Sequence, residues 1–250
     1  MLLPMRLLLI ILTLGWAGSC WSQDKTPTLK FGINQNYAAP FILRDQNNNP
    51  NGGILFDLMN EIAREMKLPA SATMIPRNRI EQLLGDGTVD MVCRTKRAWF
   101  TRPDNLVWTD TLFDTTEIII GQLAAGDLTN LSQLNNHSVG TVIGFEYPLL
   151  SEAIANGSVT RDDAPSEESL LKKMVAGRSA YAIVDAQTYY YFVRQTNHAA
   201  MFGKRPFMLQ VHETGCAISK KSKLSALQLS EAVRKIRDDG RMAEILNRYH

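Results

Sequence analysis

The stretch Asp114-Thr115-Thr116-Glu117-Ile118-Ile119-Ile120 decides the fold together with a later stretch, Met208-Leu209-Gln210-Val211-His212. Both stretches are typical of extended chain. The block between them carries its own alternation of strand and helix patterns. A domain inserted between two halves of another needs two such connections, and two lobes joined by two strands can close like a hinge on a ligand. The pattern therefore favours two lobes, with a single doubly wound sheet as the alternative.

The chain before this block also alternates between strands and helices. Leu29–Ile33 is typical of a strand, and Val89–Cys93 is an apolar strand of the buried type. A helix between them is indicated by one apolar stripe, formed by Leu55, Leu58, Met59, Ile62, Ala63 and Met66. Alternation of this kind predicts an α/β architecture with mostly parallel sheets.

The inserted block and the chain after it give further predictions. Helices are expected over Glu146–Asn156 and Ser166–Val175, and no strand is predicted between them. Ser179–Val184 is expected to be a strand. The patterns over Met208–His212 and Gly215–Ser219 predict two separate strands.

Composition excludes several classes of function. The 250 residues contain 27 Lys and Arg against 25 Asp and Glu, a net charge of +2, which is too weak to suggest a nucleic-acid partner. The four histidines show no ligand spacing, and three cysteines are too few for a zinc site or a disulfide-dense scaffold. No hydrolase or metalloprotease motif is present, so neither catalysis nor a cofactor is indicated.

The first 22 residues predict a secretory signal peptide. Met1–Arg6 carries one positive charge, Leu7–Trp16 is mostly apolar, and small residues follow. Cleavage after Ser22 would give a soluble periplasmic protein, which we favour, and cleavage before Cys20 would give a lipoprotein. No later apolar run approaches the length that spans a bilayer. An oxidising compartment permits a bridge between Cys93 and Cys216, and two buried free thiols are the alternative.

Several short motifs are weak singly and specific in their order. They are Leu29–Ile33 followed by Tyr37–Phe41, Gly53–Leu58, Leu83–Asp90, Trp108–Phe113, Val139–Gly144 and Gly177–Asp185. In this order and spacing, the chain resembles the family 3 solute-binding proteins, periplasmic receptors typified by those of amino-acid ABC importers. The resemblance covers essentially the whole chain after the signal peptide.

The resemblance implies a type II periplasmic binding protein fold. Each lobe would be a mostly parallel sheet flanked by helices, and two hinge strands would join the lobes. Lobe 1 is expected over residues 27–114 and 212–250, and lobe 2 over residues 115–211. Such a protein would act as a monomer that captures a small carboxylate-bearing solute, an amino acid or related polar molecule, and delivers it to an ABC permease.

The resemblance also implies a set of ligand-binding residues. By position, Arg102 would pair with the ligand carboxylate, since a planar guanidinium makes two charge-assisted hydrogen bonds to it. Asp185 would bind the ligand ammonium from the other lobe, and it is also a good helix N-cap. Tyr37 would pack on the ligand and Trp108 would flank the cleft. Gly144 ends a strand where free backbone N–H groups favour an anion.

Other positions depart from the pattern of the family. Phe145 replaces a threonine, so that a hydroxyl donor is lost. Thr95 and Arg97 lie in the charged stretch Arg94–Arg97, where relatives mostly carry small polar residues, and we count both as candidate ligand contacts. That stretch is either a solvated face or a site for a ligand with more than one anionic group. The departures predict a divergent branch of the family.

Two alternative functions remain open. Relatives of this fold serve as input domains of membrane sensors, and this chain could act in that way by docking on a separate membrane partner. A few relatives are dehydratases, whose chemistry needs a positioned acid or base in the cleft. Glu117 and Glu146 are possible acids, but nothing in the sequence pairs them with a tuned partner. We therefore expect a binding protein and not an enzyme.

Overall fold

The computed structural model describes residues 26–250. The predicted signal peptide, residues 1–22, and its two cleavage sites lie outside the described residues. Among the described residues, no helix has the length and apolar character needed to cross a membrane.

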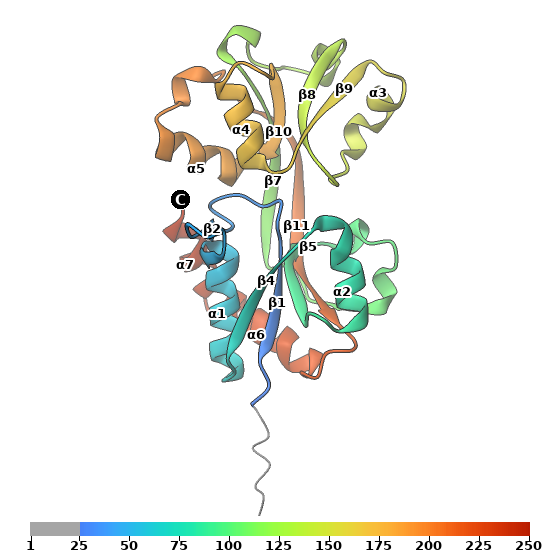
Figure 1. The fold of residues 1–250 in the computed structure, drawn as a ribbon, viewed down its shortest axis with the longest axis vertical. Helices are drawn as coiled ribbons and strands as arrows, with labels where there is room; N and C mark the ends of the chain where they lie inside the picture. Colours follow the sequence, from blue (N-terminus) through green and yellow to red (C-terminus); the bar gives the residue numbers. More distant parts are fainter. Residues whose placement is uncertain (1–25) are drawn as a thin grey trace, which may run out of the picture.

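The centre of the molecule is a curled sheet of nine strands (Figure 1). Its order is β4-β1-β5-β11-β7-β10-β8-β9, and β6 pairs with β11. The strands are β1 Leu29–Asn34, β4 Ala70–Ile75, β5 Met91–Thr95, β6 Leu106–Trp108, β7 Phe113–Gly121, β8 His137–Val142, β9 Val159–Ala164, β10 Tyr181–Asp185 and β11 Phe207–Ser219. A separate small hairpin pairs β2, Leu43–Arg44, with β3, Pro50–Gly52.

Within residues 26–250, seven α-helices flank the sheet. They are α1 Ile54–Met66, α2 Ile80–Asp86, α3 Ser151–Ala155, α4 Glu167–Val175, α5 Ala186–Thr196, α6 Ala226–Asp238 and α7 Arg241–Arg248. In Figure 1, α1, α2, α6 and α7 surround one half of the sheet, and α3, α4 and α5 surround the other half. We call the half built on β1, β4, β5 and β6 the first lobe, and the half built on β8, β9 and β10 the second lobe.

Both lobes are mixed α/β units, as the sequence predicts. β1 runs parallel to β4 and β5, and β8 runs parallel to β9 and β10. The antiparallel pair β7 and β11 passes from one lobe to the other, with register from Phe207 opposite Ile119 to Thr214 opposite Phe113 (Figure 1). This pair gives the chain its two interlobe connections. The lobe boundaries at residues 114/115 and 211/212 stay predictions.

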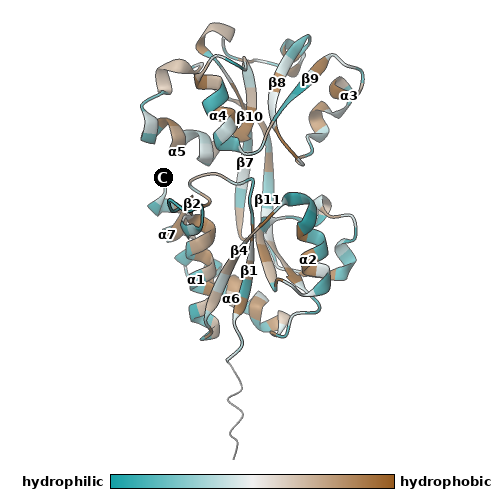
Figure 2. Cartoon of the chain, in the orientation of Figure 1, coloured by the Kyte–Doolittle hydropathy of each residue, from teal (hydrophilic) through white to brown (hydrophobic). Residues whose placement is uncertain are grey.

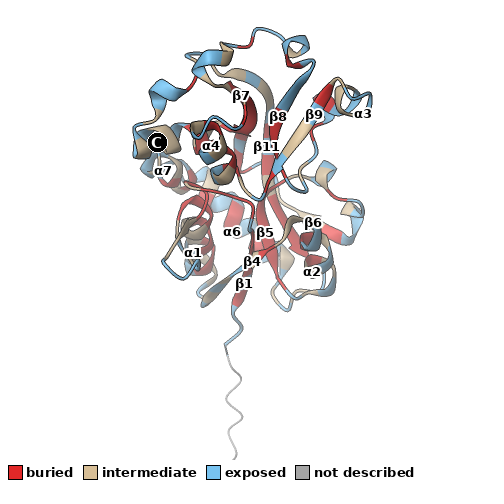
Figure 3. Ribbon diagram, turned by 45° about the horizontal axis from the view of Figure 1, so that its top comes forward, coloured by how far each residue is buried: buried red, intermediate tan, exposed pale blue. Residues whose placement is uncertain are grey.

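Each lobe has its own hydrophobic core. In the first lobe, the residue that precedes α1 is its N-cap Gly53, whose φ of 100° is left-handed, and a Cβ there would lie 2.8 Å from the Ile42 Cα and the Pro40 oxygen. The buried face of α1, including Leu58 and Ile62, packs on β1 and α6. Figure 2 shows that α1 and α2 each carry both hydrophobic and hydrophilic residues. Figure 3 shows that buried residues concentrate along the central strands, such as β5.

The structure differs from the sequence predictions at three elements. β11 is one strand of 13 residues where two were expected, with a register shift between Gly215 and Cys216. α3 begins only at Ser151, because Pro148 opens a short 3-10 helix before it. β9 was not predicted, and it occupies the edge of the second lobe's sheet.

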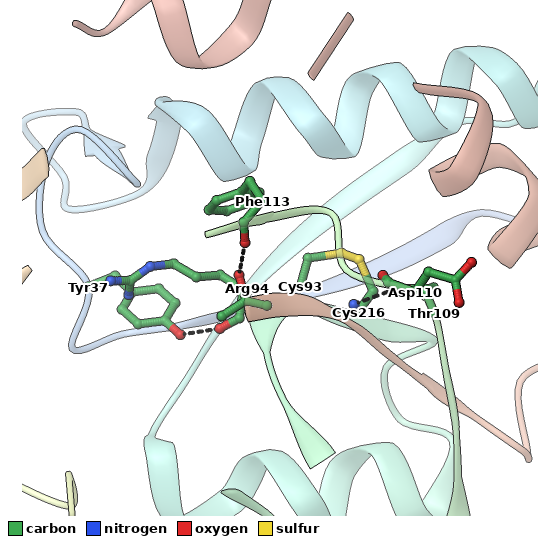
Figure 4. The surroundings of a disulfide bond; sticks show 8 residues. Tyr37, Cys93, Arg94, Thr109, Asp110, Phe113 and Cys216 are labelled. Atoms are coloured by element: carbon green, nitrogen blue, oxygen red, sulfur yellow. Dashed lines mark hydrogen bonds between the residues drawn. A yellow bond between two sulfur atoms is a disulfide. The ribbon is translucent and has the colours of Figure 1, made fainter. Parts of the chain in front are cut away.

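The structure joins Cys93 on β5 to Cys216 on β11 by a disulfide (Figure 4). The two residues face each other on the antiparallel strands, with their Cα atoms 3.9 Å apart. Both are buried in the core of the first lobe. The bridge therefore fastens a hinge strand to the central strand of that lobe.

Candidate functional site

A cavity of about 90 Å³ lies between the lobes, beside the hinge strands β7 and β11 that pass from one lobe to the other. Its charged walls are Arg77 and Arg94 from the first lobe, Glu117 and His212 from the hinge strands, and Glu146, Glu167 and Asp185 from the second lobe. This volume holds several water molecules. Both lobes line the cavity, so the structure is a closed arrangement.

A buried ion pair joins the two lobes at this cavity. Nη2 of Arg94 donates to Oδ2 of Asp185 at 3.0 Å, and the side chains are 8% and 2% exposed. Asp185 ends β10 and caps α5, since its Oδ1 accepts the backbone N–H groups of Gln187 and Thr188 at 2.8 and 3.3 Å. The carboxylate of Asp185 is thus bonded at both oxygens by the chain itself.

The guanidinium of Arg94 lies on two aromatic rings. Its central carbon is 4.3 Å from the ring centre of Tyr37 and 3.8 Å from that of Phe41. The Tyr37 hydroxyl donates to the Arg94 carbonyl oxygen at 2.8 Å (Figure 4). Burial acts to lower the pKa of Arg94, but Asp185, Tyr37 and Glu167 together outweigh it and raise the pKa above its ordinary value. Arg94 is therefore a permanent buried cation.

The backbone at Arg94 is unusual for a side-chain-bearing residue. Its φ is 57°, in the left-handed region, which costs energy for residues other than glycine. Its Nε atom is buried and has no hydrogen-bond partner among residues 26–250. Both features show that the surrounding groups fix this guanidinium at some local cost.

A second buried acid lies beside the ion pair. One oxygen of Glu167 accepts the backbone N–H of Asp185 at 2.7 Å, and the other accepts the Thr188 hydroxyl at 3.4 Å. Burial raises the pKa of Glu167 to about 7, although the Arg94 charge acts to lower it. Glu167 therefore exchanges a proton near neutral pH.

A polar cluster on the hinge strands forms another wall. Nε2 of His212 lies 3.1 Å from a Glu117 oxygen, and Nζ of Lys96 lies 2.9 Å from His212 Nδ1. A lysine ammonium can only donate, so Nδ1 is the acceptor and the ring proton sits on Nε2, where it is donated to Glu117. The edge of Trp99 packs on the ring at 5.2 Å between centres. The cluster ties the chain after β5 to the hinge.

Arg77 and Phe145 close the cavity on another side. Nη2 of Arg77 donates to the Trp99 oxygen at 2.6 Å, and its stem lies beside Gly144, where an added Cβ would be 3.6 Å from the Arg77 Cβ. Phe145, which is partly buried, packs against the cores of both lobes. This ring and the Arg77 stem therefore bring the lobes into direct contact.

The structure places five of the predicted site residues around the cavity. They are Tyr37, Thr95, Gly144, Phe145 and Asp185. Their contact with a ligand stays a prediction.

The other three predicted residues lie elsewhere. Arg102 is exposed, and its backbone N–H donates to Glu81. Arg97 is exposed and pairs with Asp104, and Trp108 packs edge-on against Phe100 at 5.0 Å.

The expectation that Arg102 faces Asp185 across the cleft is therefore not met in this structure. Trp99 and Phe100 turn inward and line the cavity, which leaves Arg102 on the outer surface. Arg94 occupies the position opposite Asp185 instead.

Sequence reasoning missed the central role of Arg94 and the burial of Glu167. Arg94 was grouped with a charged stretch, yet it directly follows the buried run Met91–Cys93, and this position was the available signal. Glu167 follows the helix cap Ser166, and nothing in its neighbourhood predicts burial. Over residues 26–250, no cluster of three or more histidine, cysteine or acidic side chains has the arrangement of a metal site.

Comparison with known proteins identifies similar chains. The family described as bacterial extracellular solute-binding proteins, family 3, matches residues 29–250. No curated protein matches the sequence.

Solved structures share the fold at low sequence identity. An ancestral arginine-binding protein bound to arginine aligns with a TM-score of 0.73 and 19% identity, over 89% of this chain and 97% of that chain. A histidine kinase sensor domain with similarity to periplasmic binding proteins aligns with a TM-score of 0.72 and 19% identity, over 91% of this chain and 97% of that chain. The substrate-binding protein of an amino acid ABC transporter aligns with a TM-score of 0.70 and 14% identity, over 89% of this chain and 99% of that chain. These likenesses establish a type II periplasmic binding protein fold.

Proposed function

We propose that this chain, which belongs to the bacterial extracellular solute-binding proteins of family 3, captures a small carboxylate-bearing solute between its lobes. The solute would be an amino acid or a related polar molecule, and it would be handed to an ABC permease. The observation that carries the proposal is the interlobe cavity, which draws charged walls from both lobes and from the hinge strands. A solute that touches both lobes stabilises closure, since only the closed state offers both sets of contacts.

Arginine chemistry supports the carboxylate part of the proposal. Arg77 and Arg94 both line the cavity, and a guanidinium binds a carboxylate through parallel charge-assisted hydrogen bonds. Arg77 uses only Nη2 for its bond to Trp99 and keeps further donors for a solute. We therefore assign the carboxylate to these two arginines, in place of Arg102.

The proposed setting is the periplasm, after removal of a signal peptide, with the protein acting as a monomer. The Cys93–Cys216 bridge supports this setting, because disulfides persist in oxidising compartments. The proposal assigns binding and no catalysis.

A sensor role is the second candidate. The similarity to a histidine kinase sensor domain favours it, at the level of the fold. In that role the closed form would dock on a membrane partner and pass no solute on. The two roles share the cavity and differ in the partner, so transport of the bound solute by intact cells with and without this protein would separate them.

Thermal unfolding of the mature protein against a panel of solutes tests the binding function. The panel contains the standard amino acids, polyamines, dicarboxylates, prephenate and arogenate. A solute at about a hundred times its dissociation constant adds about 2.7 kcal/mol, which raises the unfolding midpoint by roughly 5–10 °C for a chain of this size. We expect a shift with carboxylate-bearing members that is lost in Arg77→Met. A panel in which only polyamines shift the midpoint would contradict the carboxylate assignment.

A further inference from the structure

The cavity contains an acid whose charge the chain neutralises by itself. Both oxygens of Asp185 are bonded, one to Arg94 across the lobes and the other to two backbone N–H groups of α5. The Asp185 side chain is 2% exposed. This carboxylate already accepts three hydrogen bonds from the chain itself, which uses most of its acceptor capacity.

The surroundings of the Arg94 guanidinium are those of a cation-binding position. Two aromatic faces, Tyr37 and Phe41, lie within 4.3 Å of its central carbon, and Asp185 supplies a counter-charge at 3.0 Å. Aromatic faces with a nearby acid are how proteins bind cationic groups. Glu167 adds a second acid next to Asp185. The chain fills this position with its own side chain.

We propose that Arg94 occupies the cation-binding position of the cavity, so that the solute is a carboxylate with no cationic group at its Asp185 end. The inference rests on the proposed function and narrows its substrate class to carboxylic acids that lack an α-ammonium, such as 2-hydroxy acids. A solute ammonium could reach Asp185 only by displacing Arg94, and this would leave a buried guanidinium without a counter-ion.

The remaining acids of the cavity leave one competing arrangement. Glu117 is engaged by His212, whereas Glu146 lines the cavity, is exposed and has no ion-pair partner among residues 26–250. An ammonium bound by Glu146 would give a zwitterion receptor that does not use Asp185. The experiments below separate this arrangement from the one proposed.

The first experiment empties the position and refills it from solution. Arg94→Gly removes the side chain and suits the left-handed backbone, since glycine adopts a positive φ readily. The probe is guanidinium chloride at about 10 mM, which is far below the concentrations that unfold proteins. If the dissociation constant is about 1 mM, the unfolding midpoint of Arg94→Gly rises by about 3 °C.

Three controls make the result specific. The parent protein should give no shift with guanidinium chloride, and Arg94→Gly should give none with sodium chloride at the same concentration. Arg94→Gly combined with Asp185→Asn should also give none, because asparagine keeps the cap of α5 and removes the charge. If Arg94→Gly does not fold, Arg94→Asn replaces it, as asparagine also tolerates the left-handed backbone.

The second experiment measures the selectivity of the parent protein by calorimetry. Matched pairs are used: L-alanine with L-lactate, and L-glutamate with L-2-hydroxyglutarate. We expect the hydroxy acid to bind at least about tenfold more tightly than its amino acid. Arg94→Gly should reverse this preference, because Asp185 is then free to pair with the ammonium of the amino acid.

Each outcome decides something. An amino acid that binds the parent more tightly than its hydroxy acid overturns the proposal, and loss of that preference in Glu146→Gln would assign the ammonium to Glu146. An Arg94→Gly variant that ignores guanidinium also overturns it. If no amino acid or hydroxy acid binds the parent while guanidinium stabilises Arg94→Gly, the proposed binding of a carboxylate is wrong. The proposal that Arg94 occupies the cation-binding position then stands.

Discussion

Two arginines of this molecule make ion pairs of opposite kinds. Arg241, at the start of α7, contacts Asp239, Glu61 and Glu65 at 2.7 to 3.2 Å, all within the first lobe, and its side chain is 20% exposed. Arg94 contacts one acid, Asp185, in the other lobe, and is almost fully buried. The larger number of partners does not give Arg241 the larger effect on free energy, because water solvates Arg241 and does not reach Arg94.

The difference also concerns which equilibrium each pair controls. The bonds of Arg241 hold α7 to α1 whether the lobes are open or closed. The bond of Arg94 exists only when the lobes meet. Arg241 therefore contributes to the stability of one lobe, and Arg94 to the balance between open and closed forms.

The largest effect is expected from Asp185→Ala. This change leaves Arg94 buried without a counter-charge in the closed form, which costs about 3–5 kcal/mol, and water can relieve that cost only if the lobes separate. The radius of gyration from small-angle X-ray scattering should therefore increase. Asp185→Asn is the matched control for the helix cap and should open the molecule as well. A scattering curve equal to that of the parent would show that the pair does not hold the lobes together.

A smaller effect is expected from Glu167, and it depends on pH. Its pKa is about 7 in the folded protein, raised by burial, against 4.5 as the ordinary value. The folded protein then binds more protons than the unfolded chain between about pH 4.5 and 7. The contribution of Glu167 to stability is complete below pH 4.5 and is lost as the pH rises through 7, by an amount on the order of 3 kcal/mol.

Glu167→Gln checks the sign of this effect. Glutamine can still accept the Asp185 N–H and cannot ionise. The free energy of unfolding of the variant, measured by urea unfolding, should therefore fall less steeply than that of the parent between pH 5 and 8. Parallel profiles of the two proteins would mean that Glu167 keeps an ordinary pKa. Arg94, Asp185 and Glu117 act on the same carboxyl and are unchanged in the variant.

The smallest effect is expected from Arg241→Met. Methionine keeps the apolar stem and removes the three ion pairs, which are partly solvated, so the free energy of unfolding should fall by about 1 kcal/mol or less. Solute affinity and the scattering curve should stay those of the parent. An opened molecule in this variant would erase the distinction between the two arginines.

The elements that sequence patterns predicted well are those whose signal is local. The stripe on α1 and the apolar run of β5 each encode their own burial; α1 forms where expected, and β5 begins and ends two residues later than the predicted Val89–Cys93. β9 escaped prediction because Asp162 and Asp163 interrupt its pattern. The charge of Asp163 is met by its near neighbour Arg161, and that of Asp162 by Lys173, which the folded structure brings close.

The candidate site shows the same limit more sharply. Motif order located the strand ends that line the cavity, and Asp185 and Tyr37 lie there. Spacing could not tell which arginine between Arg94 and Arg102 points inward, because Trp99 and Phe100 take the inner positions and turn Arg102 outward. Which of several nearby cations is buried depends on packing against distant residues, here Tyr37 and Phe41.

The disulfide has a consequence for the connectivity of the molecule. Cys93 and Cys216 are 123 positions apart, and the covalent ring that they close contains the whole second lobe and most of both hinge strands. A protease that cuts the chain once inside this ring releases nothing, since both products stay linked through sulfur. In an environment rich in proteases, the receptor would keep its two lobes on one molecule after such a nick, and would come apart only on reduction.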